Sequence, residues 1–356
     1  MRVMITGGCG FIGSAFVLRT IAKTDADIVN LDCLTYAANL ESLASVSESG
    51  RYIHEVVDIV DEKAVDDAFF RHKPDAIVNF AAETHVDRSI HGPRAFVETN
   101  VLGTLNLLES AKNIWTSIPE AKREQCRFLQ ISTDEVYGTL RPEEPAFTEQ
   151  TAYAPSSPYA ASKAAADHLV RAFGKTYGLP TLITNCSNNF GPRQFPEKLI
   201  PYMIVRALAG ESLPLYGDGL NVRDWLHVDD HCDAIWCVLR RANAGSTYNI
   251  GANAEIANVD LVMMICGILD ELRPREKGFS YCSQIEYVKD RPGHDRRYAI
   301  NSTKLMEELG WSPTRTFEHS LRETILWYLD NYAWVERIVS GNYRDWEIKH
   351  YSAMTL

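Results

Sequence analysis

Several features that mark specialised classes of protein are missing from this chain of 356 residues. Its eight cysteines are scattered, and no two have the Cys-x-x-Cys spacing of a redox pair or zinc site, so we expect core-filling thiols and no metal site. No apolar run approaches the roughly 20 residues that a membrane-spanning helix needs. Strand character begins at once, with Arg2 to Ile5, so we expect no signal peptide and a cytoplasmic location.

An excess of positive charge is also missing. Lysine and arginine number 36 against 47 aspartates and glutamates, which gives a net charge of −11. An acidic surface repels phosphate backbones, so nucleic acid is not an expected partner. A membrane is not expected either, because no apolar run is long enough to span one. A ligand that carries phosphate must instead be bound by local arginines, lysines and helix N-termini. The apolar content of 46% is that of an ordinary globular protein, and the length suggests about two domains.

The first half of the chain alternates short apolar runs with amphipathic stretches. We expect buried strands at Val3–Thr6, Ile28–Leu31, Ile53–Val57, Ala76–Phe80, Phe128–Ile131 and Thr181–Thr184. We expect helices at Phe11–Lys23, Glu62–Arg71, Arg94–Lys112 and Pro158–Tyr177. Strands that alternate with helices form right-handed βαβ units, so the fold class is α/β, with a Rossmann-type doubly wound parallel sheet.

The pattern loosens after Cys186, where glycine and proline recur. Two longer helices are expected there, at Val259–Leu272 and near Phe317–Tyr332. We therefore expect a Rossmann domain at 1–186, with later elements at about 226–250 returning to it. Residues 187–356 would form mainly a smaller α/β substrate-binding domain. The segment after Tyr332 is not assigned.

A glycine-rich motif follows the first expected strand. Gly7, Gly10 and Gly13 form G-x-x-G-x-x-G at the start of the first expected helix, where backbone amides can approach a pyrophosphate. Asp32 ends the second strand, where its carboxylate can accept from both ribose hydroxyls and would repel a 2′-phosphate. This arrangement predicts NAD rather than NADP. Asp58, after the third strand, is a candidate for the adenine amine, and a plain surface aspartate is an equal alternative.

Tyr159 and Lys163 stand four residues apart, on one face of an expected helix. Ser157 is the expected N-cap, and Pro158 takes the first helical position. A free tyrosine has a pKa of about 10, and a nearby ammonium group lowers that value by stabilising the phenolate. The pair can then remove a hydroxyl proton while NAD accepts hydride from the same carbon.

Eight blocks, in order along nearly the whole chain, resemble the extended short-chain dehydrogenase/reductase family and, within it, the dTDP-glucose 4,6-dehydratases. The blocks are Thr6–Gly13 (TGGCGFIG), Ala81–Ser89 (AAETHVDRS), Ser132–Gly138 (STDEVYG), Pro155–Lys163 (PSSPYAASK), Asn185–Pro192 (NCSNNFGP), Pro196–Pro201 (PEKLIP), Arg223–Trp225 (RDW) and Asp290–Tyr298 (DRPGHDRRY). The resemblance implies an NAD-dependent hydro-lyase that moves a hydride from carbon 4 to carbon 6 of a nucleotide-linked glucose. The product would feed the synthesis of deoxysugars such as rhamnose.

Asp134 and Glu135 distinguish this reaction from its alternatives. A 4-epimerase needs only Tyr159, Lys163 and the Thr133 hydroxyl, whereas loss of water needs two more proton transfers. Adjacent carboxylates can divide those transfers if their pKa values differ. By resemblance, Glu135 is the base at carbon 5, Asp134 the acid at carbon 6, and Thr133 binds the developing carbonyl oxygen. A UDP-glucose 4,6-dehydratase remains an alternative function. An epimerase, a decarboxylase and a non-catalytic NAD sensor are further alternatives, and they are less favoured.

The resemblance also assigns the remaining site residues. The expected NAD site consists of Gly7, Gly10, Phe11, Ile12, Gly13, Asp32, Asp58, Ile59, Ala81, Ala82, Thr99, Tyr159, Lys163 and Cys186. The expected nucleotide-sugar site consists of Thr84, Thr133, Asn188, Glu197, Lys198, Leu199, Pro214, Tyr216, Arg223, Asn258, Arg291, His294 and Tyr298. Arg223 and Arg291 would clamp the diphosphate, because a planar guanidinium fork suits paired phosphate oxygens. Asn100 would lie near the sugar and nicotinamide.

The expected helix Arg94–Lys112 is apolar over more than one face. Such a helix must bury both sides, one against the sheet and the other against a partner. Together with the helix Pro158–Tyr177 it could form the four-helix interface of a homodimer, which the family resemblance also implies.

Overall fold

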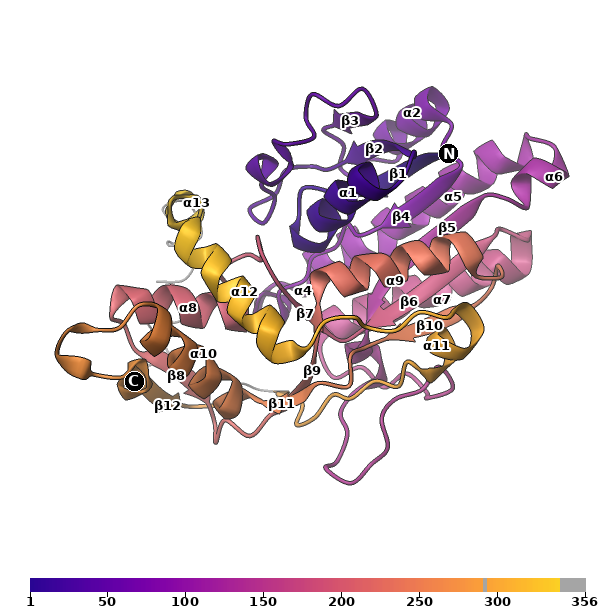
Figure 1. Cartoon of the computed structure of the whole chain (residues 1–356). Coiled ribbons are helices and arrows are strands. Elements are labelled where there is room, and N and C mark those ends of the chain that lie inside the picture. The colour runs from indigo at the N-terminus through magenta and orange to yellow at the C-terminus, as the bar shows by residue number, and fades with distance from the viewer. Residues whose placement is uncertain (291–292, 340–356) are drawn as a thin grey trace.

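The computed structural model describes residues 1–290 and 293–339. Its centre is a seven-stranded sheet in the order β10-β6-β5-β4-β1-β2-β3 (Figure 1). All neighbouring strands in it are parallel. The strands are β1 (Arg2–Thr6), β2 (Asp27–Leu31), β3 (Tyr52–Glu55), β4 (Ala76–Asn79), β5 (Arg127–Thr133), β6 (Thr181–Cys186) and β10 (Thr247–Ile250). The predicted Rossmann-type doubly wound sheet is confirmed.

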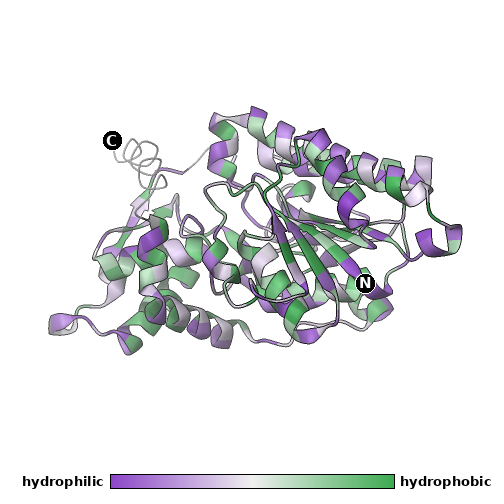
Figure 2. Cartoon of the chain, turned by 90° about the horizontal axis from the view of Figure 1, so that it is seen from above, coloured by the Kyte–Doolittle hydropathy of each residue, from purple (hydrophilic) through white to green (hydrophobic). Residues whose placement is uncertain are grey.

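Helices cover both faces of this sheet because its strand side chains alternate between two cores. Val3 and Ile5 of β1 belong to one core, and Met4 belongs to the other. The first face carries α1 (Phe11–Lys23), α9 (Val228–Arg241) and α11 (Thr303–Leu309). The opposite face carries α2 (Glu62–His72), α5 (Thr104–Thr116) and α7 (Pro158–Tyr177). Apolar colour accordingly runs along the strands in Figure 2, while the helices alternate in colour.

Two predicted helices are divided in the structure. The stretch 94–112 consists of α4 (Pro93–Phe96), a π-helical segment η2 (Val97–Gly103) and α5. A Cβ at Gly103 would lie 2.5 Å from the Ile59 side chain, so glycine permits this close packing. The second division follows Asp330, where α12 (Phe317–Asp330) ends and α13 (Tyr332–Val339) begins. The unassigned segment after Tyr332 is thus helical as far as Val339, and its remainder lies outside the described residues.

A second group of elements packs beside the carboxyl ends of the central strands (Figure 1). Its sheets pair β7 (Asn188–Phe190) and β11 (Glu255–Ala257) with β9 (Val222–His227), and β8 (Leu213–Tyr216) with β12 (Ile285–Val288). Its helices are α8 (Leu199–Ala209), α10 (Asn258–Leu272), α12 and α13. The remaining short elements are η1 (Leu40–Leu43), α3 (Val86–His91), α6 (Glu120–Arg123), η3 (Asp134–Tyr137), η4 (Glu276–Gly278) and η5 (Tyr281–Gln284). Among the described residues, no helix is long and apolar enough to span a membrane.

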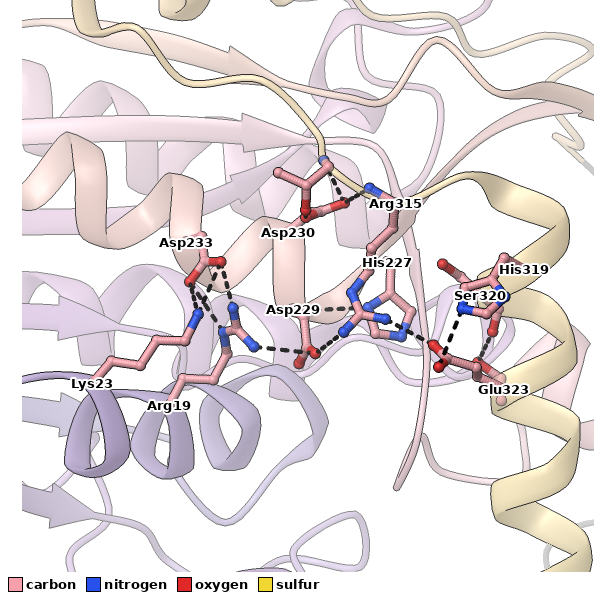
Figure 3. A network of polar contacts seen from close by, with 12 residues as sticks. Arg19, Lys23, His227, Asp229, Asp230, Asp233, Arg315, His319, Ser320 and Glu323 are labelled. Atoms are coloured by element: carbon pink, nitrogen blue, oxygen red, sulfur yellow. Dashed lines mark hydrogen bonds and ion pairs between the residues drawn. The ribbon is translucent and has the colours of Figure 1, made fainter.

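A polar network ties the second group to the sheet (Figure 3). Arg315, just before α12, pairs with Asp229 of α9 at 3.0 Å and with Glu323 of α12 at 2.8 Å. The buried carboxylate of Asp230 accepts from the Thr314 hydroxyl at 2.7 Å and from the Arg315 backbone N–H at 3.1 Å. Arg19 of α1 also pairs with Asp229, at 3.1 Å. These contacts connect α1, α9 and α12.

Candidate active site

The loop between β1 and α1 is shaped by its glycines. Gly7 has φ +69°, and a Cβ there would lie 2.8 Å from the backbone of Ala81. A Cβ at Gly13 would lie 2.3 Å from the Gly7 carbonyl oxygen, so this helix start can approach the loop only without a side chain. Gly10 differs, since the sole neighbour within 4 Å of an added Cβ is the Gly7 oxygen at 3.4 Å. The open space at Gly10, next to the N-terminus of α1, fits a pyrophosphate.

Asp32 connects the glycine loop to the second strand. Its Oδ2 accepts from the Cys9 backbone N–H at 2.8 Å, and its Oδ1 accepts from Leu34 N–H at 2.8 Å. Each carboxylate oxygen keeps a further lone pair for a ribose hydroxyl. Asp58, by contrast, is exposed and caps a local turn by accepting from Val60 N–H at 2.9 Å. Both aspartates line the same cavity.

That cavity has a volume of about 460 Å³. The structure places on its wall every residue that the sequence assigned to NAD: Gly7, Gly10, Phe11, Ile12, Gly13, Asp32, Asp58, Ile59, Ala81, Ala82, Thr99, Tyr159, Lys163 and Cys186. Asn100 lies behind the wall instead. Its side chain bonds to the backbone of Glu83 and to the Ser162 hydroxyl, so it holds the loop after β4 in place. Glu83 itself lines the cavity, and sequence reasoning missed it.

Tyr159 and Lys163 lie on the first turns of α7. The Ser157 hydroxyl caps this helix by accepting from Ala160 N–H at 3.1 Å, and Pro158 occupies the first turn. Lys163 donates to the Ile131 carbonyl at 2.6 Å. Burial lowers the pKa of Lys163, and Asp167 and Cys186 oppose that effect.

The expectation of a lowered tyrosine pKa is wrong for this structure. The pKa of Tyr159 lies well above its ordinary value, because burial disfavours the phenolate. The neighbouring Glu135, Cys186 and Asp134 add to the rise, and a hydrogen bond with Thr133 opposes it. A positive charge close to the phenolate is therefore needed before Tyr159 can act as a base near neutral pH.

The carboxylate pair begins the short helix η3, directly after β5. The Thr133 hydroxyl caps it by accepting from Glu135 N–H at 3.3 Å and lies 3.3 Å from Asp134 Oδ1, to which it donates. Asp134 is only 2% exposed, and its Oδ2 has no hydrogen-bond partner in the described part of the chain. Burial raises the pKa of Asp134 well above its ordinary value, and Glu135 and Asp224 raise it further. Burial and its acidic neighbours therefore favour the protonated form of Asp134.

A second cavity, of about 530 Å³, adjoins the first. The two share Thr84, Glu135, Asn188, Asn189, Gln194, Glu197 and Lys198. On the second wall lie Thr84, Asn188, Glu197, Lys198, Leu199, Pro214, Tyr216, Arg223, Asn258, His294 and Tyr298, while Thr133 lines the first cavity and Arg291 lies outside the described residues. Among the described residues, the buried amide oxygens of Asn188 and Asn258 have no hydrogen-bond partner. Such unpaired polar atoms beside a cavity indicate a polar ligand.

Arginines and aromatic rings shape the second cavity. Arg223 lies 4.2 Å from the centre of the Tyr298 ring and donates to the carbonyls of Val222 and Asp295. The His294 ring packs edge-on to Tyr216, at 6.0 Å between ring centres. Arg206, which sequence reasoning missed, also lines this wall, because nothing about an isolated arginine on α8 marks it as a ligand contact.

A buried cluster closes the junction of the two cavities. Glu197 lies 3.8 Å from both His85 and Arg88, and Tyr36 donates to it at 3.3 Å. The Arg88 guanidinium lies 3.6 Å from the Tyr36 ring centre. His85 and Asp87 also line the second cavity. Tyr36 lies in the segment after β2, His85 and Arg88 lie at α3, and Glu197 lies in the segment before α8, so residues far apart in the sequence meet here and no local sequence signal reveals the cluster.

The glycine loop, the buried Tyr159–Lys163 pair and the adjoining polar cavity define an enzyme of the short-chain dehydrogenase/reductase type. The chain belongs to the GDP-mannose 4,6 dehydratase family, whose model matches residues 4–324.

Named relatives agree with this placement. The chain is 56% identical over 359 aligned positions to a dTDP-glucose 4,6-dehydratase of Shigella flexneri, with 99% of each chain covered. A crystal structure of dTDP-glucose 4,6-dehydratase from Bacillus anthracis in complex with NAD is 44% identical, with a TM-score of 0.83 and coverage of 95% and 99%. A dTDP-glucose 4,6-dehydratase from Streptomyces venezuelae, with NAD and TYD bound, is 42% identical, with a TM-score of 0.86 and coverage of 95% and 100%.

Proposed function

We propose that this protein is a hydro-lyase that converts dTDP-glucose to dTDP-4-keto-6-deoxyglucose with NAD as its resident cofactor. One observation carries the proposal: Tyr159, Asp134 and Glu135 line the same cavity, Glu135 also lines the adjoining one, and Asp134 is buried with a raised pKa. An epimerase has no use for such an acid. The names of the relatives support the dehydratase reading over the epimerase and favour a thymidine nucleotide over a uridine one.

The glycine cradle and Asp32 fit NAD, as the open space at Gly10 and the free lone pairs of Asp32 indicate. NAD, when bound there, supplies an acceptor that takes a hydride from carbon 4 and returns it to carbon 6. Tyr159 removes the proton of the 4-hydroxyl, and Lys163 supplies the positive charge that its phenolate needs. The Thr133 hydroxyl holds the oxygen that becomes the carbonyl.

The adjacent carboxylates then remove water. The new ketone acidifies the C–H bond at carbon 5, and Glu135 takes this proton. Asp134 donates its proton to the departing 6-hydroxyl, which leaves as water. After hydride has reached carbon 6, Glu135 returns its proton to carbon 5. A proton that passes from Tyr159 to Asp134 through solvent restores both groups, so no NAD is consumed.

We assign NAD to the domain formed by residues 1–186 together with α9 and β10, and the nucleotide sugar mainly to the elements after residue 187. Arg223 supplies a guanidinium fork to the diphosphate, and Pro214 and Tyr216 flank the base. Asn188, at the junction of the cavities, has a free amide oxygen for a sugar hydroxyl.

We assign the interface of a homodimer to the outer face of η2, α5 and α7. Leu107 and Leu108 are fully buried against the sheet, whereas Val97 and Leu102 are 55% and 42% exposed. The outer side of α7 lies beside α5, where Lys112 lies 4.9 Å from the Tyr177 ring centre. Two such helix pairs, related by a two-fold axis, would form a four-helix interface.

Incubation of the purified protein with catalytic NAD and either dTDP-glucose or UDP-glucose tests this function. We expect a product lighter by one water, with the alkaline absorbance of a 4-keto-6-deoxy sugar and no net change in NAD. If UDP-glucose is turned over faster than dTDP-glucose, the substrate in the proposal becomes the uridine nucleotide. Formation of galactose at unchanged mass would show an epimerase and would refute the roles given to Asp134 and Glu135.

A further inference from the structure

Asp167 lies one turn beyond Lys163 on the inner face of α7, and its side chain is fully buried. Its Oδ2 accepts from the Ser132 hydroxyl at 2.7 Å and from the Tyr153 hydroxyl at 2.9 Å. Its Oδ1 has no hydrogen-bond partner within the described residues. Burial of a carboxylate is costly unless a positive charge compensates it. This position therefore calls for a cationic neighbour.

The surroundings of Asp167 hold it in one orientation. Tyr153 accepts from Arg171 at 2.8 Å and from the Asn185 side chain at 3.2 Å while it donates to Asp167. The Arg171 guanidinium also lies 4.7 Å from the Tyr153 ring centre. β5 contributes Ser132, β6 contributes Asn185, and the loop before α7 contributes Tyr153. Ser132 and Tyr153 thus donate directly to this buried carboxylate, which lines neither cavity, and Asn185 and Arg171 hold the Tyr153 hydroxyl.

The charge of Lys163 depends on this carboxylate. A neutral amine could donate to the Ile131 carbonyl equally well, so that hydrogen bond does not require an ammonium. The acidic groups that favour the ammonium are Asp167, on the same helix, and Cys186 of β6; burial disfavours it. Burial also raises the pKa of the Cys186 thiol to about 12, which leaves Asp167 as the carboxylate that acts on the lysine.

The remaining charges do not replace Asp167. Glu135 and Asp134 of η3 and Cys186 of β6 all oppose ionisation of Tyr159. Burial raises the pKa of Asp167, and Lys163, the hydrogen bonds from Ser132 and Tyr153, and Arg171 oppose that rise by favouring the carboxylate. The Tyr137 phenol faces the same region. Lys163 lies four residues after Tyr159 on the same face of α7, and both line the first cavity, so its ammonium is placed to offset the acids around Tyr159. Burial disfavours the charge of Lys163, and Asp167, which lines neither cavity, opposes that effect.

We propose that Asp167 is a positioning residue that keeps Lys163 protonated, so that Tyr159 can ionise, and that Ser132 and Tyr153 hold Asp167 in place. This inference rests on the proposed role of Tyr159 as the base. Removal of the negative charge lowers the pKa of Lys163 and so raises that of Tyr159. The acid limb of the pH–rate profile, where Tyr159 must lose its proton, moves to higher pH.

The test compares Asp167→Asn and Tyr153→Phe with wild type, using dTDP-glucose and saturating NAD from pH 5 to pH 10. For Asp167→Asn we expect the acid limb of kcat/KM to rise by about one pH unit or more, which is a tenfold loss at pH 7. KM should stay within about twofold of wild type. Tyr153→Phe, which keeps the carboxylate but removes one donor, should move the limb less and in the same direction.

Asp230→Asn is the matched control, because Asp230 is also a buried, hydrogen-bonded aspartate but lies on α9 and lines neither cavity. It should lower the thermal unfolding temperature and leave the acid limb unchanged. An acid limb that stays in place in both Asp167→Asn and Tyr153→Phe overturns the role of Asp167. If Asp167→Asn does not fold, Tyr153→Phe alone decides by the same criterion. A wild type that removes no water from dTDP-glucose would instead refute the proposed function.

Discussion

The backbone N–H of Cys9 donates a 2.8 Å hydrogen bond to Oδ2 of Asp32, 23 positions further along the chain. The middle of the glycine loop is thereby tied to the end of the second strand. One carboxylate both shapes the loop that approaches a pyrophosphate and faces the expected position of the ribose.

Asp32→Asn tests this double role. Loss of the charge weakens the hydrogen bonds to the ribose hydroxyls, and hydrogen bonds to charged groups contribute about 1.5–3 kcal/mol. We expect the Kd for NAD to rise about tenfold or more and the preference over NADP to shrink, as measured by calorimetric titration. Asp25→Asn, an exposed aspartate just before β2, should change neither value. Unchanged NAD affinity and unchanged discrimination in Asp32→Asn would refute the assignment.

Gly10 and Gly13 should respond differently to alanine. At Gly13 the new Cβ meets the Gly7 carbonyl oxygen at 2.3 Å, so Gly13→Ala should destabilise the cofactor-free protein by about 1–3 kcal/mol. At Gly10 the contact is an ordinary 3.4 Å, so Gly10→Ala should leave thermal unfolding nearly unchanged. The Kd for NAD should nevertheless rise at least about tenfold, because the methyl group occupies the pyrophosphate's approach. Equal stability losses in the two variants would contradict this reading of the loop.

Asp134→Asn and Glu135→Gln should block different steps. In deuterated water, Asp134→Asn should still exchange the proton at carbon 5, while loss of water slows by about 10²–10⁴-fold. Glu135→Gln should neither exchange the proton at carbon 5 nor release water from the substrate. Mass spectrometry of the recovered sugar nucleotide distinguishes the two cases. Exchange that persists in Glu135→Gln would mean that another group is the base.

The raised pKa of Asp134 also predicts a direction in the pH–rate profile. An acid must hold its proton to donate it, so the rate should fall as pH rises through the pKa of Asp134. Its stability effect has the same sign. The folded state binds the proton more tightly than the unfolded state, so stability decreases as pH rises above about 4, the ordinary pKa of an unfolded aspartate. At pH 7, Asp134→Asn should therefore be at least as stable as wild type in urea.

The burial of His231 predicts that the stability of the folded protein decreases in acid. The ring is fully buried on α9, 2.9 Å from Asn189 Oδ1, and burial lowers its pKa to about 3. An unfolded histidine has a pKa near 6.5, so between these values the unfolded state binds the extra proton. Stability should then fall by about 1.4 kcal/mol for each pH unit below about 6. Urea unfolding of His231→Asn should lack this slope, whereas the exposed His91→Gln should retain it.

The assigned dimer face gives a prediction about assembly. Val97→Glu with Leu102→Glu places two charges on the outer face of η2, where a partner helix would have to bury them. Sedimentation should show a dimer for wild type at micromolar concentration and a monomer for the double variant. Met263→Glu, at an equally exposed position (52%) on α10, should stay dimeric. A wild type that sediments only as a monomer would refute the interface.

Much of the fold could be predicted because its signals are local. The alternation of apolar runs with amphipathic stretches indicated six of the seven central strands, and the predicted bounds of α1 and α7 agree with the structure. β10 could be placed only as part of a returning segment, since its pairing with β6 joins residues about sixty positions apart. The π-helical segment η2 was not predicted. Its last residue, Gly103, packs against Ile59, which lies in the turn before α2 and more than forty positions away in the sequence.

The sequence by itself determined which chemical groups are present and how closely they follow one another: the three glycines after β1, the Tyr159–Lys163 spacing, and the carboxylates Asp134 and Glu135. The positions of these residues relative to one another within a helix or strand do not depend on how the rest of the chain is arranged. Helix and strand periodicity alone decides which of them lie on the same face.

The tertiary structure decided how those groups ionise. The pKa of Asp134 is raised because the surrounding core excludes water and because Glu135 and, from β9, Asp224 lie near it. The pKa of Tyr159 is raised for the same reason, against the expectation from spacing alone. Asp167 gained a role only when Ser132 and Tyr153 closed around it. Desolvation depends on every neighbour of a group, whatever its place in the chain, and so it becomes defined only when the chain is folded.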